Sequence, residues 1–278
     1  MNVIRHKTAR EFLERAGEWL EQAEAENNLI PGISRYFVTN EGRAQVNPYL
    51  LTVEESGTLL GAVLMTPPRH LIIARMSDPA LVALADYFLK ESITVPGVVG
   101  PKSMTQLFAD YWKIKTGKSS RLKMSQGIYA CERVVFPVYN RGRLRPAIES
   151  DETLLVEWSG EFCRDAGIED EIEYQKTRIP NEIARQSLYV WDKGQAVSMA
   201  LVQRETARGV CISMVYTPPH LRKQGYATSC VAALTQRMLD SGKRFCCLYT
   251  DLTNPTSNAI YQNIGYEPVC GSEDLVFK

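Results

Sequence analysis

The chain has 278 residues, of which 45% are hydrophobic and 23% charged, a balance that is ordinary for a globular protein and excludes general disorder. Basic and acidic residues number 32 each, so the formal net charge is zero, which disfavours a nucleic-acid binder with a basic surface. No apolar run approaches the roughly 18 residues that span a bilayer, and the first residues predict no signal peptide.

The N-terminal part is predicted to mix helices and strands. Apolar periodicity indicates a helix over residues 9–27 with a stripe formed by Phe12, Ala16, Trp19, Leu20 and Ala23. Strands are predicted over residues 49–53, 61–65, 71–74, 95–99 and 127–136. A second helix begins with Asp78 as N-cap and Pro79 at its first position, and a third covers residues 103–115.

A polar, basic and turn-rich segment over residues 138–146 predicts a linker. A cut there gives two domains, residues 1–143 and residues 144–278, each of ordinary domain size.

The C-terminal part broadly repeats the order of the first. Helices are predicted over residues 152–166, 169–185, 227–241 and 256–264. Strands are predicted over residues 187–191, 196–203, 210–216, 245–249 and 267–277, the first two joined by a turn at Asp192-Lys193-Gly194. The pattern indicates a mixed α/β fold that arose by tandem duplication.

Three common nucleotide or metal motifs are not present in complete form. Gly117-Lys118-Ser119 resembles the end of a phosphate-binding loop, but Trp112 stands where the first glycine is required. There is no GxGxxG or HExxH, and the three histidines are scattered, so a nicotinamide cofactor or a metal has no support.

A basic turn that contains glycine precedes the helix at residue 227. It reads Arg222-Lys223-Gln224-Gly225-Tyr226-Ala227 and follows a strand ended by two prolines. A helix N-terminus has unsatisfied N–H groups and a positive dipole end, so this turn can hold a pyrophosphate, with Gly225 allowing close approach. The alternative is an ordinary helix start.

A second motif follows about thirty residues later. Residues 254–266 read NPTSNAIYQNIGY, in which Asn254 is a good N-cap, Pro255 fits the first helical turn and Gly265 fits a C-cap. The two stretches, in this order and after these strands, strongly resemble the GNAT family of N-acetyltransferases over residues 144–278. The resemblance implies two tandem acyl-CoA N-acyltransferase-like domains, each a mixed, largely antiparallel sheet flanked by helices.

The resemblance also implies roles for individual residues. The backbone of Val215, Tyr216 and Thr217 would lie along the pantetheine arm of acetyl-CoA, where the strand parts from its neighbour. Asn254 and Asn258 would contact the cofactor, and the Tyr261 hydroxyl would act as general acid near the sulfur, unless Tyr261 simply packs. Backbone amides would cradle the pyrophosphate, supplied by Arg222, Lys223, Gln224, Gly225, Tyr226, Ala227 and Thr228.

The implied activity is transfer of an acetyl group from acetyl-CoA to a primary amine by direct attack on the thioester. The acceptor is a small molecule or a peptide, with no nucleic acid and no membrane as partner. Glu205 is the carboxylate expected nearest the acetyl group and is one candidate base, with a chain of waters as its rival. Alternatives are a catalytically silent CoA-binding sensor or interaction module, another acyl donor, or a peptide acceptor.

The N-terminal part departs from this pattern. Residues 75–80, Arg75-Met76-Ser77-Asp78-Pro79-Ala80, contain no glycine and place an acidic cap where the pyrophosphate would lie. This half is therefore expected to be a degenerate copy that does not bind CoA and walls the substrate cleft.

Two further features concern charge and compartment. Four carboxylates, Glu169, Asp170, Glu171 and Glu173, form either a negative rim for a cationic acceptor or an ordinary acidic helix start. Seven cysteines without CxxC spacing are expected to be reduced thiols of a cytoplasmic protein.

Overall fold

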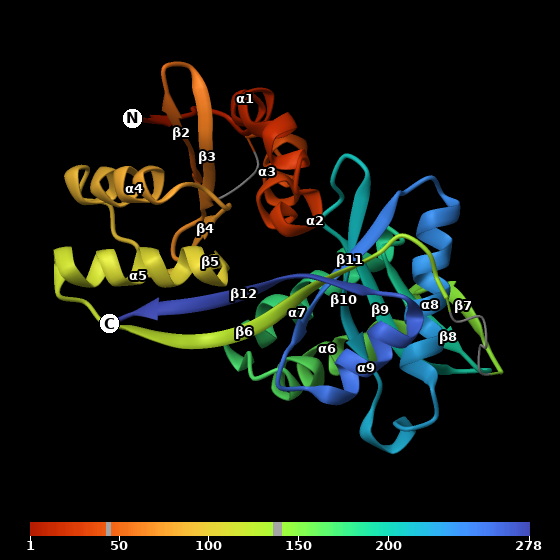
Figure 1. Ribbon diagram of the computed structural model, residues 1–278. Helices are drawn as coiled ribbons and strands as arrows, with labels where there is room; N and C mark the ends of the chain where they lie inside the picture. Colours follow the sequence, from red (N-terminus) through yellow and green to blue (C-terminus); the bar gives the residue numbers. More distant parts are fainter. Residues whose placement is uncertain (43–45, 136–140) are drawn as a thin grey trace. The chain divides into compact units, whose positions relative to one another are not determined.

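The computed structural model describes residues 1–42, 46–135 and 141–278 (Figure 1). The described chain divides into two compact units. Unit 1 contains residues 1–129, 249–254 and 268–278, and unit 2 contains residues 130–248 and 255–267. The chain therefore returns to unit 1 twice, over residues 249–254 and 268–278. The predicted division after residue 143 has a single boundary between two continuous domains.

Unit 1 is built on a sheet in which most strands are antiparallel. Its strand order is β1 (Asn2–Arg5), β2 (Tyr49–Glu55), β3 (Thr58–Met65), β4 (Leu71–Ile73), β5 (Gly97–Pro101), β12 (Glu267–Phe277) and β6 (Ser120–Cys131). Strands β1 to β4 form an antiparallel meander, and β4 and β5 are parallel. Strand β12 is antiparallel to β5, so a segment from the end of the sequence completes the unit that contains its beginning.

Helices cover both faces of this sheet (Figure 1). They are α1 (Ala9–Glu21), α2 (Glu24–Asn27), α3 (Leu29–Thr39), α4 (Asp78–Lys90) and α5 (Lys102–Thr116). Neighbouring residues of β2 serve opposite faces: Leu50 packs in the core under α1 and α3, and Leu51 packs in the core under α4 and α5. This alternation follows from the two-residue period of a strand.

The helix predicted over residues 9–27 is wrong at its C-terminal end. Helix α1 ends at Glu21, and Ala23, expected on the buried stripe, is exposed with an irregular backbone (φ −132°, ψ 58°). Phe12, Ala16 and Leu20 are buried as predicted. Helix α3 was not predicted. Its Pro31 lies in the first turn, where proline is tolerated because its missing N–H is not needed there.

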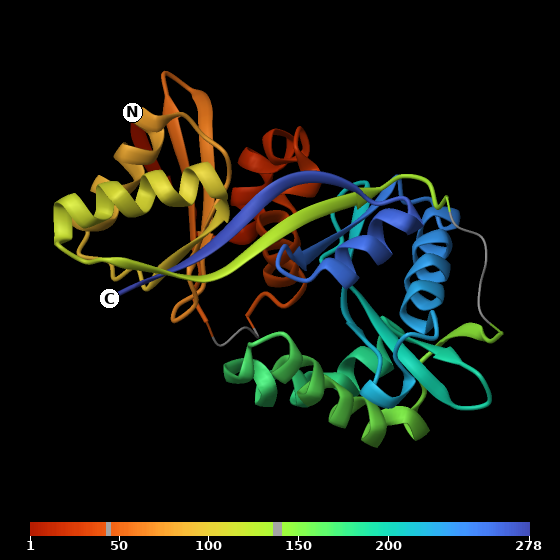
Figure 2. The ribbon, with the colours of Figure 1, turned by 60° about the horizontal axis from the view of Figure 1, so that its bottom comes forward.

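The strands of unit 2 are also largely antiparallel, with helices on both faces (Figure 2). Its strand order is β11 (Phe245–Asp251), β10 (Gly209–Tyr216), β9 (Ala196–Gln203), β8 (Leu188–Asp192) and β7 (Arg143–Pro146). Helices α6 (Glu152–Asp165) and α7 (Ile172–Ala184) pack on one core, in which Trp158 and Ile179 meet Met199 and Tyr216. Helix α8 (Tyr226–Asp240) lies between β10 and β11 in sequence and packs on β8 and β9, and α9 (Pro255–Ile264) follows β11.

The linker predicted over residues 138–146 is wrong for its last residues, which form β7. Residues 136–140 lie outside the described chain. Strand β7 pairs with β8, and Arg145 binds two carboxylates at once: its Nε lies 2.6 Å from Asp192 Oδ2, and its NH1 lies 2.6 Å from Asp151 Oδ2. A basic segment becomes a strand here because acidic partners from two other elements hold it.

Two successive parts of the sequence therefore repeat one order: an antiparallel three-strand meander, a helix, a parallel strand, a helix and a last strand, which is β6 in the first repeat and β12 in the second. This order confirms the expected fold class of two tandem acyl-CoA N-acyltransferase-like domains. All seven cysteines are free thiols, as expected. Among the described helices none is both long and apolar enough to cross a membrane.

Candidate functional site

Strand β10 is irregular just before the predicted site. Its antiparallel register with β9 shifts between Ser213 and Tyr216, and Met214 adopts a left-handed conformation (φ 48°), which marks a β-bulge. On the other edge, the parallel register with β11 ends at Cys211 and Cys247, although β10 continues to Tyr216. The predicted parting of the two strands is confirmed, and the backbone around Val215 is released from the ladder on that side.

Side chains fix the end of β10. The Ser198 hydroxyl of β9 donates to the Tyr216 carbonyl oxygen at 3.0 Å, and the Thr217 hydroxyl donates to Ser198 Oγ at 3.0 Å. The sequence analysis did not single out Ser198, because nothing near a serine in a buried strand indicates which groups its hydroxyl will bond to.

The loop after β10 has the geometry of an anion-binding turn. A short 3-10 helix (Pro219–Leu221) follows the strand, Lys223 and Gly225 are left-handed (φ 62° and 76°), and α8 begins at Tyr226. The N-cap residue is Gly225, which has no side chain with which to cap the helix start. Such a start offers its first N–H groups and the positive end of its dipole to an anion.

Arg222 stabilises this loop rather than extending from it. Its Nε donates to the Thr217 carbonyl oxygen at 2.9 Å, its guanidinium lies 5.7 Å from the centre of the Tyr216 ring, and it pairs with Asp165 of α6. Its backbone N–H donates to the Pro219 carbonyl oxygen at 3.3 Å. The pyrophosphate cradle predicted from Arg222 to Thr228 therefore rests on the residues after Arg222.

A second cation lies beside the helix start. Lys193 Nζ donates to the Tyr226 hydroxyl at 3.0 Å, and that hydroxyl donates to Gln224 Oε1 at 2.9 Å. Sequence reasoning assigned Lys193 only to a hairpin turn. The pairing of Met199 with Tyr216 brings this turn to the end of the sheet where the loop begins, a relation visible only once the register is known.

Helix α9 carries the predicted acid in the same unit. Tyr261 is 8% exposed, its ring contacts Tyr266 at 6.0 Å between centroids, and burial raises the pKa of its hydroxyl to about 12. Asn258 lies one turn earlier on α9, and Asn254, just before the helix, belongs to the segment counted with unit 1. Gly265 ends the helix at φ 113°, where a Cβ would approach the Arg133 carbonyl oxygen to 2.6 Å.

Glu205 does not lie with these residues. It is in the loop before Gly209, at the opposite end of β10 from Val215, and pairs with Lys243 near the start of β11. A strand rises about 3.3 Å per residue, so the length of β10 separates Glu205 from the bulge. This placement does not support Glu205 as the catalytic base.

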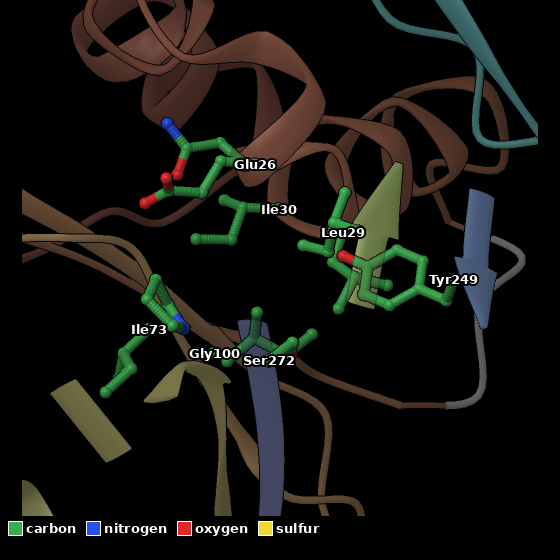
Figure 3. Close-up of a pocket in the computed structure, with 11 residues that line it drawn as sticks. Glu26, Leu29, Ile30, Ile73, Gly100, Tyr249 and Ser272 are labelled. Atoms are coloured by element: carbon green, nitrogen blue, oxygen red, sulfur yellow. The ribbon is translucent and has the colours of Figure 1, made fainter. Parts of the chain in front are cut away.

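The corresponding place in unit 1 is filled. Where β4 and β5 end, at Ile73 and Gly100, the cavity has a volume of about 10 Å³, enough for one water molecule. Figure 3 shows Leu29 and Tyr249 next to each other among the side chains that close it. Arg75 of the following loop pairs with Glu26 at 3.1 Å. Both observations show that this end of β4 and β5 is closed by side chains, and the expectation that this half does not bind CoA stays a prediction.

Comparison with known proteins supports the assignment of the fold. Residues 192–273 match the family described as FR47-like protein, and no curated protein matches the chain by sequence. A GNAT-family acetyltransferase structure from Colwellia psychrerythraea is similar, with 13% identity and a TM-score of 0.58 over 100% of this chain and 99% of that chain.

Two further structures are similar over nearly the whole length of this chain. A GCN5-related N-acetyltransferase from Sphaerobacter thermophilus has 17% identity and a TM-score of 0.62 over 99% of this chain and 95% of that chain. A tandem GNAT protein from the clavulanic acid biosynthesis pathway has 10% identity and a TM-score of 0.57 over 100% and 98%. At these identities the likeness concerns the fold, and it confirms the resemblance inferred from the two motifs.

Proposed function

We propose that this chain, which has the GNAT fold, is an N-acetyltransferase that moves an acetyl group from acetyl-CoA to a primary amine. One observation carries the proposal: β10 parts from β11 over its last residues, before a loop with left-handed residues and a helix whose N-cap is a glycine. Released strand backbone suits the amide groups of a pantetheine arm, and the helix start suits a pyrophosphate.

The residues of unit 2 divide the work of this reaction. The amides from Lys223 to Thr228 hold the pyrophosphate, and the ammonium groups of Lys223 and Lys193 add positive charge near it. The backbone of Val215 and Thr217 aligns the pantetheine arm, and a backbone N–H near Val215 stabilises the oxyanion that develops on the thioester. Tyr261, protonated because its pKa is raised, donates a proton to the leaving thiolate.

The acceptor class follows from the charge between α6 and α7. Glu169, Asp170 and Glu173 are exposed in or next to a short 3-10 helix (Glu169–Glu171), and Glu171 is half-buried. We expect this cluster to raise the local concentration of protonated amines at moderate ionic strength, so cationic acceptors should outperform neutral or anionic ones.

The test combines binding with turnover. Acetyl-CoA at about 100 times its Kd should stabilise the protein by about 2.7 kcal/mol, measured as a thermal shift. Gly225→Glu, which adds bulk and negative charge to the loop, should abolish the shift, and Asp78→Asn in unit 1 should leave it unchanged. Release of CoA with a panel of amines then measures catalysis.

The outcomes separate the alternatives. A thermal shift without CoA release from any amine supports a silent CoA-binding module. No shift with saturating acetyl-CoA contradicts the cofactor assignment, and a shift with another acyl-CoA alone points to a different donor.

A further inference from the structure

Helix α6 places a carboxylate beside the end of β10. Glu161 Oε2 accepts a hydrogen bond of 2.7 Å from the Tyr216 hydroxyl. Tyr216 directly follows Val215, whose backbone is proposed to meet the thioester. The Glu161 carboxylate therefore lies one tyrosine side chain away from the strand segment at which the acetyl group is expected.

Tyr216 is held firmly, and so is the carboxylate that it contacts. The Tyr216 ring is 4% exposed and lies 6.1 Å from the Trp158 ring, and its carbonyl oxygen accepts from Ser198. Burial and the neighbouring Glu161 raise the pKa of the Tyr216 hydroxyl. The phenol therefore stays protonated and donates, which leaves Glu161 as the acceptor of the pair.

Charged groups of both signs surround this pair. Two come from outside α6: Arg222 of the loop, whose guanidinium lies over the Tyr216 ring, and Lys176 of α7, whose side chain lies against α6 at Gly160. On α6 itself the neighbours are Arg164 and Asp165, and Asp165 is paired with Arg222. Asp165 is thus paired with a cation of the loop, whereas Glu161 accepts a hydrogen bond from a neutral phenol.

We propose that Glu161 is the base that takes the proton from the acceptor ammonium, a role that rests on the proposed acetyltransferase function. The carboxylate accepts one proton from R–NH₃⁺, and the neutral amine forms the C–N bond with the thioester carbonyl carbon. The C–S bond breaks, and the thiolate receives a proton from Tyr261. The nitrogen, which still carries one proton more than the amide, loses it, and this proton restores Tyr261, while the proton on Glu161 passes to solvent. Overall, R–NH₃⁺ and the acetyl thioester give the amide, the free thiol of CoA and one H⁺.

The pH dependence of turnover tests this role in the full chain. With Glu161 as base, kcat/KM for a primary alkylamine is expected to be nearly level around neutral pH, because the bound ammonium is deprotonated in place. In Glu161→Gln only the amine that is already neutral reacts, so the rate falls roughly 10²-fold and rises about tenfold per pH unit below the amine pKa. Glu157→Gln, an exposed position one turn earlier on α6, should match the parent.

Two further measurements guard the interpretation. The acetyl-CoA thermal shift of Glu161→Gln should equal that of the parent, which shows that unit 2 is folded. If the thermal shift of Glu161→Gln differs from that of the parent, Glu161→Asp replaces it, because this variant keeps the negative charge. Its kcat/KM should stay nearly level around neutral pH, at a lower value than the parent's. If the parent is active, a level pH profile for Glu161→Gln, or a profile for Glu161→Asp that rises with pH, overturns the role of Glu161. A parent that releases no CoA overturns the proposed function instead, and this role with it.

Discussion

Two buried tyrosines of unit 2 differ in the origin of their raised pKa values. Tyr216 donates to Glu161, and both burial and that carboxylate raise the pKa of its hydroxyl. For Tyr261 burial is the cause, and the pKa of about 12 keeps its hydroxyl protonated at every physiological pH. Tyr261 can therefore supply a proton but cannot act as a base under those conditions.

Replacing Tyr261 by phenylalanine tests its role as acid. Turnover should fall roughly 10²-fold while the Kd for acetyl-CoA stays nearly unchanged, because only the transition state uses the proton. Steady-state CoA release and a binding titration measure the two quantities. Tyr266→Phe is the matched control: its hydroxyl bonds to Thr235 at 2.8 Å, so it should cost stability rather than turnover. Equal activity of Tyr261→Phe and the parent would make Tyr261 a packing residue.

At this scale the sequence predicted the loop and Tyr261 as site residues, and these roles stay predictions, whereas the predicted base, Glu205, lies at the opposite end of β10 from Val215. Glu205 precedes β10 by a few residues, and sequence distance alone suggested proximity. Glu161 lies 55 positions before Tyr216, and no local pattern predicts their hydrogen bond. Contacts between a helix face and a strand end depend on packing, which a single sequence does not encode locally.

At the scale of elements, Arg145 joins β7, the β8 end and the start of α6. Its side chain is 21% exposed and meets Asp151 and Asp192, which are 11% and 13% exposed. The Asp151 carboxylate also accepts from the Ile148 N–H at 2.9 Å. Hydrogen bonds from Arg145 hold the pKa of both carboxyls below the usual range.

Removing Arg145 should destabilise unit 2 in a pH-dependent way. Because the folded-state pKa values of both carboxyls are lowered, their contribution is present above the unfolded value of about 4 and is lost as the pH falls through the folded values. Arg145→Met should therefore lower the free energy of unfolding by about 3 kcal/mol at pH 7, and by less near pH 3. Urea unfolding at both pH values measures this, with the exposed Arg143→Met as control. A loss of equal size at both pH values would contradict the ion-pair explanation.

Most elements could be predicted, and the failures share a cause. Strands β2, β3, β9, β10 and β12 follow the predicted pattern because alternation or turn residues mark them locally. Strand β7 was taken for a linker, and β6 begins at Ser120 rather than at residue 127, because polar strand residues are stabilised by partners distant in sequence. The residues of β12 likewise do not indicate that this strand pairs with β5.

At the scale of the whole chain, the two units do not correspond to two continuous halves. Strand β12 pairs with β5 from Ser272 with Pro101 to Val276 with Gly97, and Leu275 lies in the core of unit 1 under α4 and α5. Gln106 of α5 donates to Glu273 of β12 at 3.1 Å. Residues 268–278 are therefore part of the structure that residues 1–129 need.

Fragments test this interdependence. Residues 1–143 produced alone should lack a cooperative thermal transition, because the β5 edge and the core around Phe108 lose their cover. The full chain without residues 268–278 should lose the same transition. Co-production of residues 144–278 with the first fragment should restore part of it by supplying β12. Circular dichroism during heating measures each case, and a cooperative transition of residues 1–143 alone would show that β12 is dispensable.

The position of β12 in the sequence has a consequence for the nascent chain. About 176 residues separate the end of β5 from the end of β12, which at translation rates of 5–20 residues per second is about 9–35 s of synthesis. During that time the partner edge of β5 is open, and an open edge strand is a template for pairing with other chains. We therefore expect this protein to depend on chaperones during translation more than a protein whose first domain is complete when it leaves the ribosome.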